Sequence, residues 1–283
     1  MLFNHPPIAI ETAEPVSPFD DPECLYVALP ETMSTFVPPS MQDWRHNPKV
    51  GTILSALLDG LKAKPVGVES TVIDLTDYDT DTCELIGQIL GEGEISILVD
   101  RPKRRLIISE SVFAGVWRVK LYHDDVLIQE SLETGPYPKI LAEWLSVDKP
   151  QKSLPETFPN NLMNAPALLY EIFAKSRDFA VGSEEVINLT LLPLTPEDMT
   201  YLIDSLGLLG MSILSKGYGD CHIRRTGLPY VWWVQYFNSP GKLILNTLEI
   251  TLLPSVVMAA PEDLEDSASR LATVLSEWFN ETN

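Results

Sequence analysis

Apolar residues along the chain follow two spacings, one typical of helices and one typical of strands. From Val50 to Leu61 they recur every three or four positions, which predicts an amphipathic helix. From Glu94 to Val99 every second residue is apolar, which predicts a strand with one buried face. Segments of both kinds alternate along the chain. The pattern therefore predicts an α+β protein in which helices cover a mostly antiparallel sheet.

Short blocks of sequence recur 114 to 116 residues further along, and the order of predicted elements recurs with them. Each copy has a helix–strand–helix unit, then four strands and a helix. We interpret this as a tandem duplication of one domain. The copies are expected either to stack as two layers or to pair side by side through their sheets. The matching blocks are Val72–Leu75 with Val186–Leu189, Ile95–Leu98 with Met211–Leu214, Val116–Val119 with Val231–Val234, Leu127–Ile128 with Leu243–Ile244, and Leu132–Glu133 with Leu248–Glu249.

The predicted domain organisation has four parts. Residues 1–48 hold nine of the 23 prolines, which favours an extended N-terminal arm. We expect order near Pro30–Trp44 and mobility before it, and the arm is also a candidate partner-binding tail. The first α+β repeat is predicted over 49–147, a polar linker over 148–163, and the second repeat over 164–283.

The chain is strongly acidic, with a net charge of −20. Residues 1–150 carry 24 acidic and 12 basic side chains, and residues 151–283 carry 16 and 8, so both halves are negative. This argues against nucleic acid or an anionic membrane as the main partner. It permits a basic protein partner, whose approach the charge would accelerate, although an acidic surface also serves solubility alone.

Cysteine usage and the absence of targeting signals predict a cytoplasmic protein. The three cysteines are widely spaced and form no C-x-x-C motif, which is typical of a reducing compartment. The first residues show no basic and apolar signal-peptide pattern. No apolar run approaches the roughly 18 residues needed to span a bilayer, so no membrane insertion is expected.

Two charged clusters have both a functional and an ordinary structural interpretation. The basic turn Arg101–Arg105 could hold an anion or an acidic partner, but such turns usually cap a solvated hairpin. Asp74, Asp77, Asp79 and Asp81 resemble a cation site. They lack the glycine and the closing glutamate of a calcium loop, and acidic residues at a helix start explain most of them.

The stretch Gly217–Glu249 is predicted to form three strands, His222–Thr226, Tyr230–Phe237 and Leu243–Glu249, the last two joined by a tight turn at Asn238–Gly241. It places a cysteine next to a histidine. Neighbouring residues on a strand point to opposite faces, so the two should not form a nucleophile–base pair.

Motifs for catalysis are missing from the sequence. It has no phosphate-binding glycine loop, no G-x-S-x-G, no H-E-x-x-H and no second Cys/His group for zinc. We therefore predict no catalytic residues, no metal and no cofactor. Cys221 is either a small buried side chain or a transient thiolate ligand to iron or a cluster.

Trp232 and Trp233 should face opposite sides of the sheet, since they are adjacent on one strand. Either both are buried between sheet and helices, or one is exposed as a protein-binding anchor together with nearby tyrosines. The candidate binding residues are Tyr218, Asp220, Cys221, Arg224, Tyr230, Trp232, Trp233, Tyr236 and Asn238.

Four blocks in the C-terminal part resemble the HupH/HyaF family of hydrogenase expression/formation proteins. They are G-Y-G-D-C-H-I-R-R-T at 217–226, V-W-W-V-Q-Y-F-N-S at 231–239, L-I-L-N-T-L-E-I at 243–250, and A-A-P-E-D-L-E-D-S-A-x-R-L at 259–271. A weaker similarity extends the resemblance over about residues 50–280. Residues 1–48 carry no part of it.

The resemblance implies a cytoplasmic accessory factor in the maturation of an uptake nickel–iron hydrogenase. It implies binding of the iron–sulfur small subunit precursor before assembly and twin-arginine export. The twin-arginine signal peptide and other hydrogenase accessory proteins are further candidate partners. The family has no established catalytic residue or cofactor to carry over.

Three functional hypotheses follow from the sequence. The favoured one is a binding chaperone without turnover. The alternative is a redox or iron–sulfur-handling factor that uses Cys221. The third is a scaffold that recruits another accessory protein through the N-terminal arm.

Overall fold

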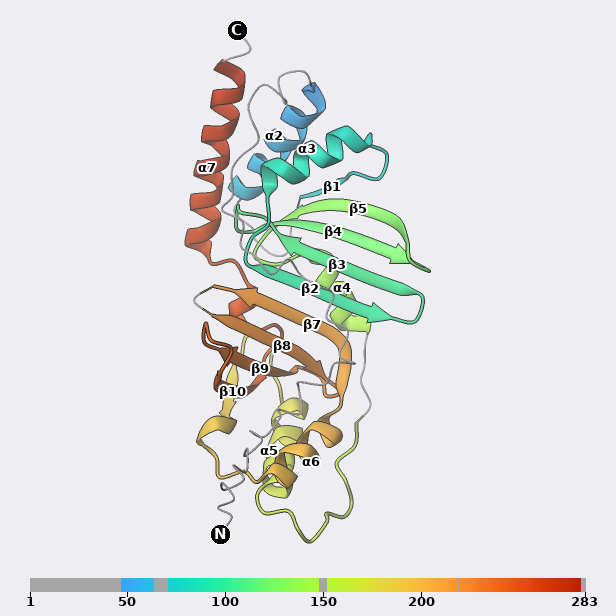
Figure 1. The fold of residues 1–283 in the computed structure, drawn as a ribbon, viewed down its shortest axis with the longest axis vertical. Coiled ribbons are helices and arrows are strands. Elements are labelled where there is room, and N and C mark those ends of the chain that lie inside the picture. Colours follow the sequence, from blue (N-terminus) through green and yellow to red (C-terminus); the bar gives the residue numbers. More distant parts are fainter. Residues whose placement is uncertain (1–46, 64–70, 148–151, 218, 281–283) are drawn as a thin grey trace, which may run out of the picture. The chain divides into compact units, whose positions relative to one another are not determined.

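The computed structural model describes residues 47–63, 71–147, 152–217 and 219–280, which belong to one unit of the chain, Phe36–Asn283 (Figure 1). The predicted arm therefore lies outside the described residues, apart from Asn47 and Pro48. The elements of the first half are α2 (Pro48–Lys62), β1 (Val72–Asp74), α3 (Thr80–Leu90), β2 (Ile95–Arg101), β3 (Arg104–Glu110), β4 (Val116–His123), β5 (Val126–Thr134) and α4 (Lys139–Val147).

The second half has the same order of elements up to its last strand. These elements are α5 (Ala165–Arg177), β6 (Glu185–Asn188), the 3₁₀ helix η1 (Leu189–Leu191), α6 (Pro196–Leu206), β7 (Leu208–Lys216), β8 (Asp220–Thr226), β9 (Val231–Phe237), β10 (Leu243–Ile250), the 3₁₀ helix η2 (Ser255–Val257) and α7 (Pro261–Asn280). The three strands predicted within Gly217–Glu249 are confirmed as β8, β9 and β10.

All ten strands form one antiparallel sheet in the order β1-β5-β4-β3-β2-β7-β8-β9-β10-β6. The two halves meet where β2 pairs with β7, with Ile97 opposite Ile213 and Val99 opposite Met211. The predicted α+β class is confirmed. Of the two predicted arrangements, the side-by-side pairing of the sheets is the one observed.

The strand order is the same in each half when read outward from the β2–β7 pair. The first half reads β2-β3-β4-β5-β1 and the second reads β7-β8-β9-β10-β6. The same irregularity of register also occurs twice, beside Ile128 in β5 and beside Ile244 in β10. A duplicated domain would produce this correspondence, and the duplication itself stays a prediction.

Helix starts follow from capping side chains. Asn47 accepts from the Lys49 amide at the start of α2, and Asp79 accepts from the Thr82 amide at the start of α3. Thr195 forms a full capping box with Asp198 at the start of α6, where Pro196 occupies the first turn. Each cap supplies an acceptor for amides that have no partner within the helix, which fixes where the helix begins.

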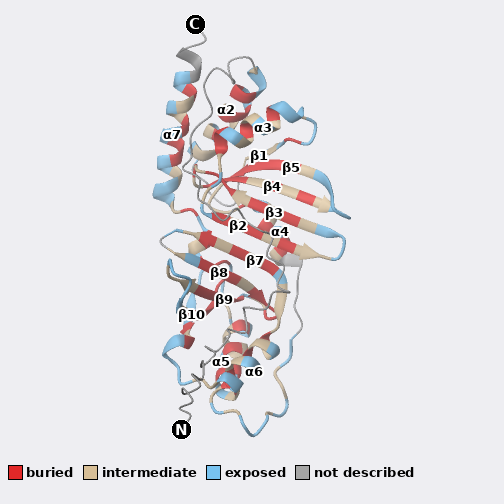
Figure 2. Ribbon diagram, in the orientation of Figure 1, coloured by how far each residue is buried: buried red, intermediate tan, exposed pale blue. Residues whose placement is uncertain are grey.

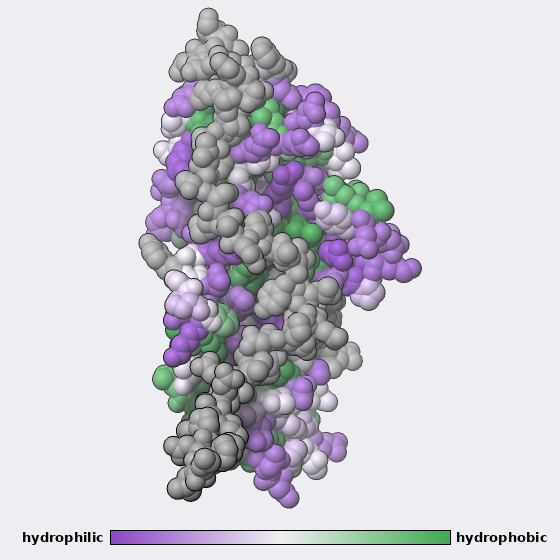
Figure 3. Space-filling model, viewed as in Figure 1, coloured by the Kyte–Doolittle hydropathy of each residue, from purple (hydrophilic) through white to green (hydrophobic). Residues whose placement is uncertain are grey.

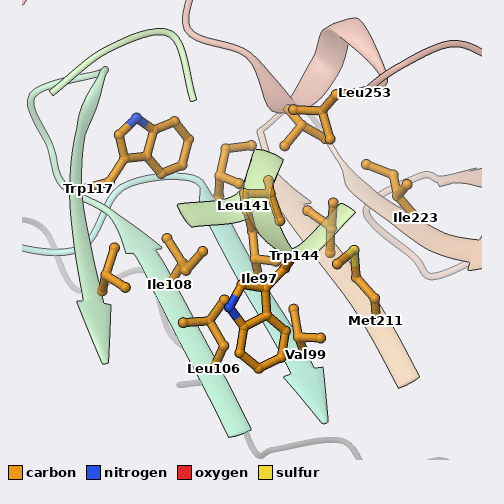
Figure 4. Close-up of a cluster of buried hydrophobic side chains, with 14 of the residues drawn as sticks. Ile97, Val99, Leu106, Ile108, Trp117, Leu141, Trp144, Met211, Ile223 and Leu253 are labelled. Carbon is orange, nitrogen blue, oxygen red and sulfur yellow. The ribbon is translucent and has the colours of Figure 1, made fainter. Parts of the chain in front are cut away.

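A central core lies on one face of the sheet and crosses the junction between the halves. It includes Ile97, Leu106 and Ile108 from the first half and Met211 and Ile223 from the second. Leu141 and Trp144 of α4 pack onto these strands, as Figure 4 shows. Because α4 covers strands from both halves, burial of its apolar face helps to hold the two sheets together.

A second core lies between α2, α3 and the first-half strands, and α7 completes it. Leu271 and Leu275 of α7 are buried among residues of α2 such as Val50, Ile53 and Leu57. The C-terminal helix therefore packs against the first half of the chain, where α2 and α7 lie side by side (Figures 1 and 2). The repeat pattern predicted the helix α7, but it did not predict that α7 packs against α2.

Candidate functional site

Eight of the nine candidate binding residues lie in the region of β8, β9 and their turns. Tyr218 lies outside the described residues. Asp220 is exposed at the start of β8, Arg224 is half-buried within it, and Asn238 is half-buried just after β9. The strands therefore bring most of the candidates into one part of the sheet, and their exposure decides what each can contact.

The two tryptophans of β9 are buried on opposite faces of the sheet, each with 1% of its surface exposed. The Trp232 indole donates to the Thr251 carbonyl at 3.2 Å, and the Trp233 indole donates to the Asn246 side-chain oxygen at 2.6 Å. Of the two sequence interpretations, burial of both rings is the one observed. Neither ring is an exposed anchor.

The first half contains a buried tryptophan whose hydrogen bond matches that of Trp232. Trp117 of β4 is fully buried in the central core, and its indole donates to the Gly135 carbonyl at 2.9 Å. The acceptor follows the end of β5, just as Thr251 follows the end of β10. In both halves a buried indole thus fixes the exit of the last strand, because a buried N–H needs an acceptor.

Cys221 lies opposite Tyr236 in the β8–β9 register, and the Tyr236 hydroxyl donates to its sulfur. Only 3% of Cys221 is exposed. Burial raises the pKa of the Cys221 thiol to about 12, and the hydrogen bond from Tyr236 offsets part of that rise. Burial also raises the pKa of Tyr236. Since the thiolate is the nucleophile and metal ligand, burial and the raised pKa argue against a chemical role for this thiol at neutral pH.

His222 lies on the opposite face from Cys221, as predicted for neighbours on a strand. Its ring centre is 4.8 Å from that of Phe237, and burial lowers the pKa of the imidazole. Cys221 instead belongs to the central core. The sheet therefore separates the thiol from the imidazole, and the two form no nucleophile–base pair.

The burial of Cys221 gives a direct prediction. In the folded protein at pH 8, iodoacetamide should alkylate Cys221 at least about a hundredfold more slowly than a free cysteine, because few thiols are ionised and the sulfur is covered. Peptide mass spectrometry after timed labelling measures this rate. Unfolding in denaturant should restore normal labelling. Fast labelling of the folded protein would contradict the burial and favour a chemical role for the thiol.

Tyr230 and Asn238 occupy the turns at the two ends of β9. Tyr230 has a positive φ of 62° and stacks on Phe179 with ring centres 4.2 Å apart, leaving 40% of its surface exposed. The Asn238 side chain accepts from the Lys242 amide at 2.8 Å, and the Gly241 amide donates to the Asn238 carbonyl. These contacts stabilise the predicted tight turn, so Asn238 has a structural task.

Two buried carboxyl groups, Glu133 and Glu249, occupy matching positions in β5 and β10. Neither was among the candidate binding residues. Burial raises the pKa of Glu133, offset in part by the Lys139 and Ile140 amides, which donate to it at the start of α4. Burial raises the pKa of Glu249 too, with Glu184 adding to the rise. The repeated Leu-Glu pairs in the sequence were the available signal.

Several members of the two charged clusters are engaged within the fold. Arg101 and Arg104 lie over the Trp144 ring at 4.3 and 5.1 Å, while Arg105 pairs with Asp100 and Asp125.

Within the aspartate cluster, Asp79 caps α3 and pairs with Lys49, and Asp74 accepts from the Thr76 amide. Among the described residues, no group of three or more His, Cys, Asp or Glu side chains is placed to hold a metal ion.

Comparisons with known proteins decide the family. Residues 162–278 match the C-terminal conserved region of HupH hydrogenase expression protein. HoxQ of Cupriavidus necator, a hydrogenase expression/formation protein, is 39% identical over 278 residues, which is 96% of this chain and 98% of the relative. The chain belongs to the HupH/HoxQ family.

Other members of the HupH/HoxQ family are similar over most of their length. HupH of Rhodobacter capsulatus is 38% identical and covers 96% of this chain and 97% of its own. The hydrogenase-1 operon protein HyaF of Escherichia coli is 34% identical and covers 89% and 90%. A solved structure of HupH from Thiobacillus denitrificans is 28% identical over 40% of this chain and 96% of its own, with a TM-score of 0.38.

HupH/HoxQ family membership assigns the chain a role in hydrogenase maturation. It confirms the resemblance that the blocks between residues 217 and 271 carried. Among the helices that the structure describes, none is long and apolar enough to cross a membrane.

Proposed function

We propose that this protein is a chaperone-like accessory factor that binds the iron–sulfur small subunit precursor of an uptake nickel–iron hydrogenase in the cytoplasm, before assembly and export. It acts by binding, without catalytic turnover. The observation that carries the proposal is similarity to hydrogenase expression/formation proteins over 96% of the chain.

The charge and the candidate residues support a binding role. A net charge of −20 favours the approach of a basic partner segment, and a twin-arginine signal peptide is both basic and apolar. The thiol–imidazole neighbours of β8 lie on opposite faces, and burial raises the pKa of the Cys221 thiol. These features favour a binding factor over a cysteine-dependent redox or iron–sulfur-handling factor.

Capture of the precursor tests the proposal. Tagged protein is used to pull down the small subunit precursor, with and without its signal peptide, from cells that express both. We expect capture of the precursor and weaker capture once the signal peptide is removed. Failure to capture either form, with the tagged protein folded, would overturn the proposal.

Two variants separate the proposed function from its rivals. Cys221→Ser should leave both capture and hydrogenase maturation intact, whereas the redox hypothesis requires loss of maturation with intact folding and capture. Deleting residues 1–30 should leave precursor capture intact. The scaffold hypothesis instead requires that this deletion abolish binding of one accessory protein only.

A further inference from the structure

We propose that a patch on α5, α6 and the segment that leads into α5, formed by Phe158, Met163, Tyr170 and Tyr201, binds a partner segment that combines apolar side chains with arginine or lysine. We call these four residues the aromatic patch. The inference rests on the proposed binding function and gives that function a surface. It moves the expected contact from the buried tryptophans of β9 to the two helices below β10 in Figure 1.

Three segments of the chain bring the rings of the aromatic patch together. The Phe158 ring lies 5.8 Å from the Tyr170 ring of α5 and 6.1 Å from the Tyr201 ring of α6, both in tilted geometry. Such separations and tilts are those of attractive aromatic pairs. Tyr170 is 55% exposed and Met163 is 71% exposed. The patch thus offers solvent an exposed ring, and Met163 adds an exposed thioether just before the start of α5.

Asp198 fixes the geometry beneath the aromatic patch. Its buried carboxylate accepts from the amides of Met163, Asn164 and Ala165, where α5 begins, and it also closes the capping box of α6. The start of α5 is therefore tied to the first turn of α6. Because the partner then meets a preformed surface, less ordering is needed on binding.

Carboxylates surround the aromatic patch. Glu197 precedes Tyr201 by four residues and Asp204 follows it by three, so both lie on the same side of α6 as the ring, and both are exposed. Glu156 is exposed two residues before Phe158. The Lys152 amine donates to the Asp204 backbone carbonyl at 3.5 Å, which places a basic group beside Asp204.

The wider surroundings of the aromatic patch are also negative. Between Lys152 and Leu206 the chain has eight carboxylates and three basic side chains. Lys175 pairs with Glu171 and Glu185, and Arg177 pairs with Asp178. Hydrophilic side chains predominate over α5 and α6 in Figure 3. The charge around the patch therefore favours a cationic partner.

Charge also decides between this partner and a second copy of the chain. Each copy carries −20, and pairing two aromatic patches would bring two sets of carboxylates together. A segment with arginine instead gains ion pairs at the rim and cation–π contacts on exposed tyrosine faces, while its apolar residues cover the rings. Another exposed aliphatic group, Val126–Ile128, lies beside a hairpin turn and contains no ring.

The test uses the full chain and a fluorescent synthetic peptide with a pair of arginines followed by a leucine- and phenylalanine-rich run. Binding is followed by fluorescence anisotropy. Tyr170→Ala should weaken binding about tenfold, since it removes the exposed ring. Glu197→Gln with Asp204→Asn should weaken it about two- to fivefold at low salt, and this difference should shrink at high salt.

Matched controls separate the aromatic patch from general effects. Leu191→Ala removes a leucine that is 79% exposed on η1, outside the patch. Glu262→Gln removes an exposed acid from the Pro-Glu-Asp start of α7, which repeats the Pro196-Glu-Asp198 start of α6. Both should bind the peptide like the native protein. The far-ultraviolet circular dichroism spectrum of Tyr170→Ala should match that of the native protein, which guards against a folding defect in this variant.

Each outcome bears on the proposal. Unchanged binding by Tyr170→Ala, or absence of peptide binding by the native chain, overturns the inference. Equal binding of a peptide with glutamates in place of the arginines overturns the cationic requirement. If the hydrogenase precursor is captured but patch variants capture it equally well, the aromatic patch is wrong and the proposed function stands. If the native chain captures no precursor, the proposed function itself fails.

Discussion

Asp198→Ala is expected to lower the free energy of unfolding by about 3 to 5 kcal/mol, since it would leave one buried and three part-buried backbone amides without an acceptor. The carboxylate is fully buried. It accepts from Met163 and Ala165 at 3.0 Å, from Asn164 at 3.1 Å and from Thr195 at 3.2 Å. Alanine supplies none of these bonds, so the start of α5 loses its acceptor and the capping box of α6 keeps only the bond that the Thr195 hydroxyl accepts from the backbone amide of residue 198.

The ionisation of Asp198 makes this contribution depend on pH. Burial alone would raise the pKa of the carboxyl group, but the four backbone amides together outweigh it and hold the pKa below its usual value. A lowered folded-state pKa means that the stability is present above the unfolded-state pKa, near 3.9. It is lost as the pH falls further, through the folded-state pKa. Native protein should thus lose stability in strong acid more steeply than Asp198→Ala.

Chemical denaturation of native and variant protein measures the effect. Asp263→Ala is the matched control, because Asp263 is the exposed acid at the same position of the Pro-Glu-Asp start of α7. It should change stability by less than about 0.5 kcal/mol. Asp198→Asn keeps one acceptor oxygen and should fall between the two. Equal effects of Asp198→Ala and Asp263→Ala would show that burial adds nothing to an ordinary helix cap.

The sequence predicted the elements of this fold better than their partners. Alternation and aromatic content located β8, β9 and β10, since a strand records in its own residues which side is buried. The acidic residues around Asp79 indicated the start of α3. Periodicity does not say which surface covers a buried side. It therefore left two arrangements of the copies open, and it gave no sign that α7 packs on α2.

For the candidate site, too, the sequence pattern did not say what covers each side chain. Adjacent positions placed Trp232 and Trp233 on opposite faces, but burial of both depends on what covers the second face. The specific blocks of β8 and β9 mark the family and supply core residues rather than an exposed surface. Phe158, Tyr170 and Tyr201 lie far apart in sequence and meet only through tertiary packing. No local spacing could have joined them.

The packing of α7 leads to the other large expected effect. Leu271→Ala should destabilise the protein by about 2 to 5 kcal/mol, because the side chain is fully buried and its removal leaves a cavity. The cavity would lie in the core of the first half, where Leu271 packs with α2 and α3. A mutation near the C-terminus should therefore loosen elements more than 180 residues away in sequence.

Hydrogen exchange distinguishes this local effect from general destabilisation. Amides of α2 and α3 should lose protection in Leu271→Ala before those of β8 and β9, since the cavity borders the former. Thr273→Ala is the control, because Thr273 is exposed on the same helix and alanine favours helices. Its melting temperature should match the native value.

The pattern of lost protection would show how the halves are coupled. Arg270 donates to the Val112 carbonyl and lies over Phe113, and the Ala259 amide donates to the Pro136 carbonyl, so several contacts besides Leu271 hold α7 on the first half. Loss of protection confined to α2 and α3 would mean that α7 stabilises the first half as a separable unit. Equal loss in β8 and β9 would contradict that view, and would mean that the β2–β7 pairing makes the whole sheet unfold as one.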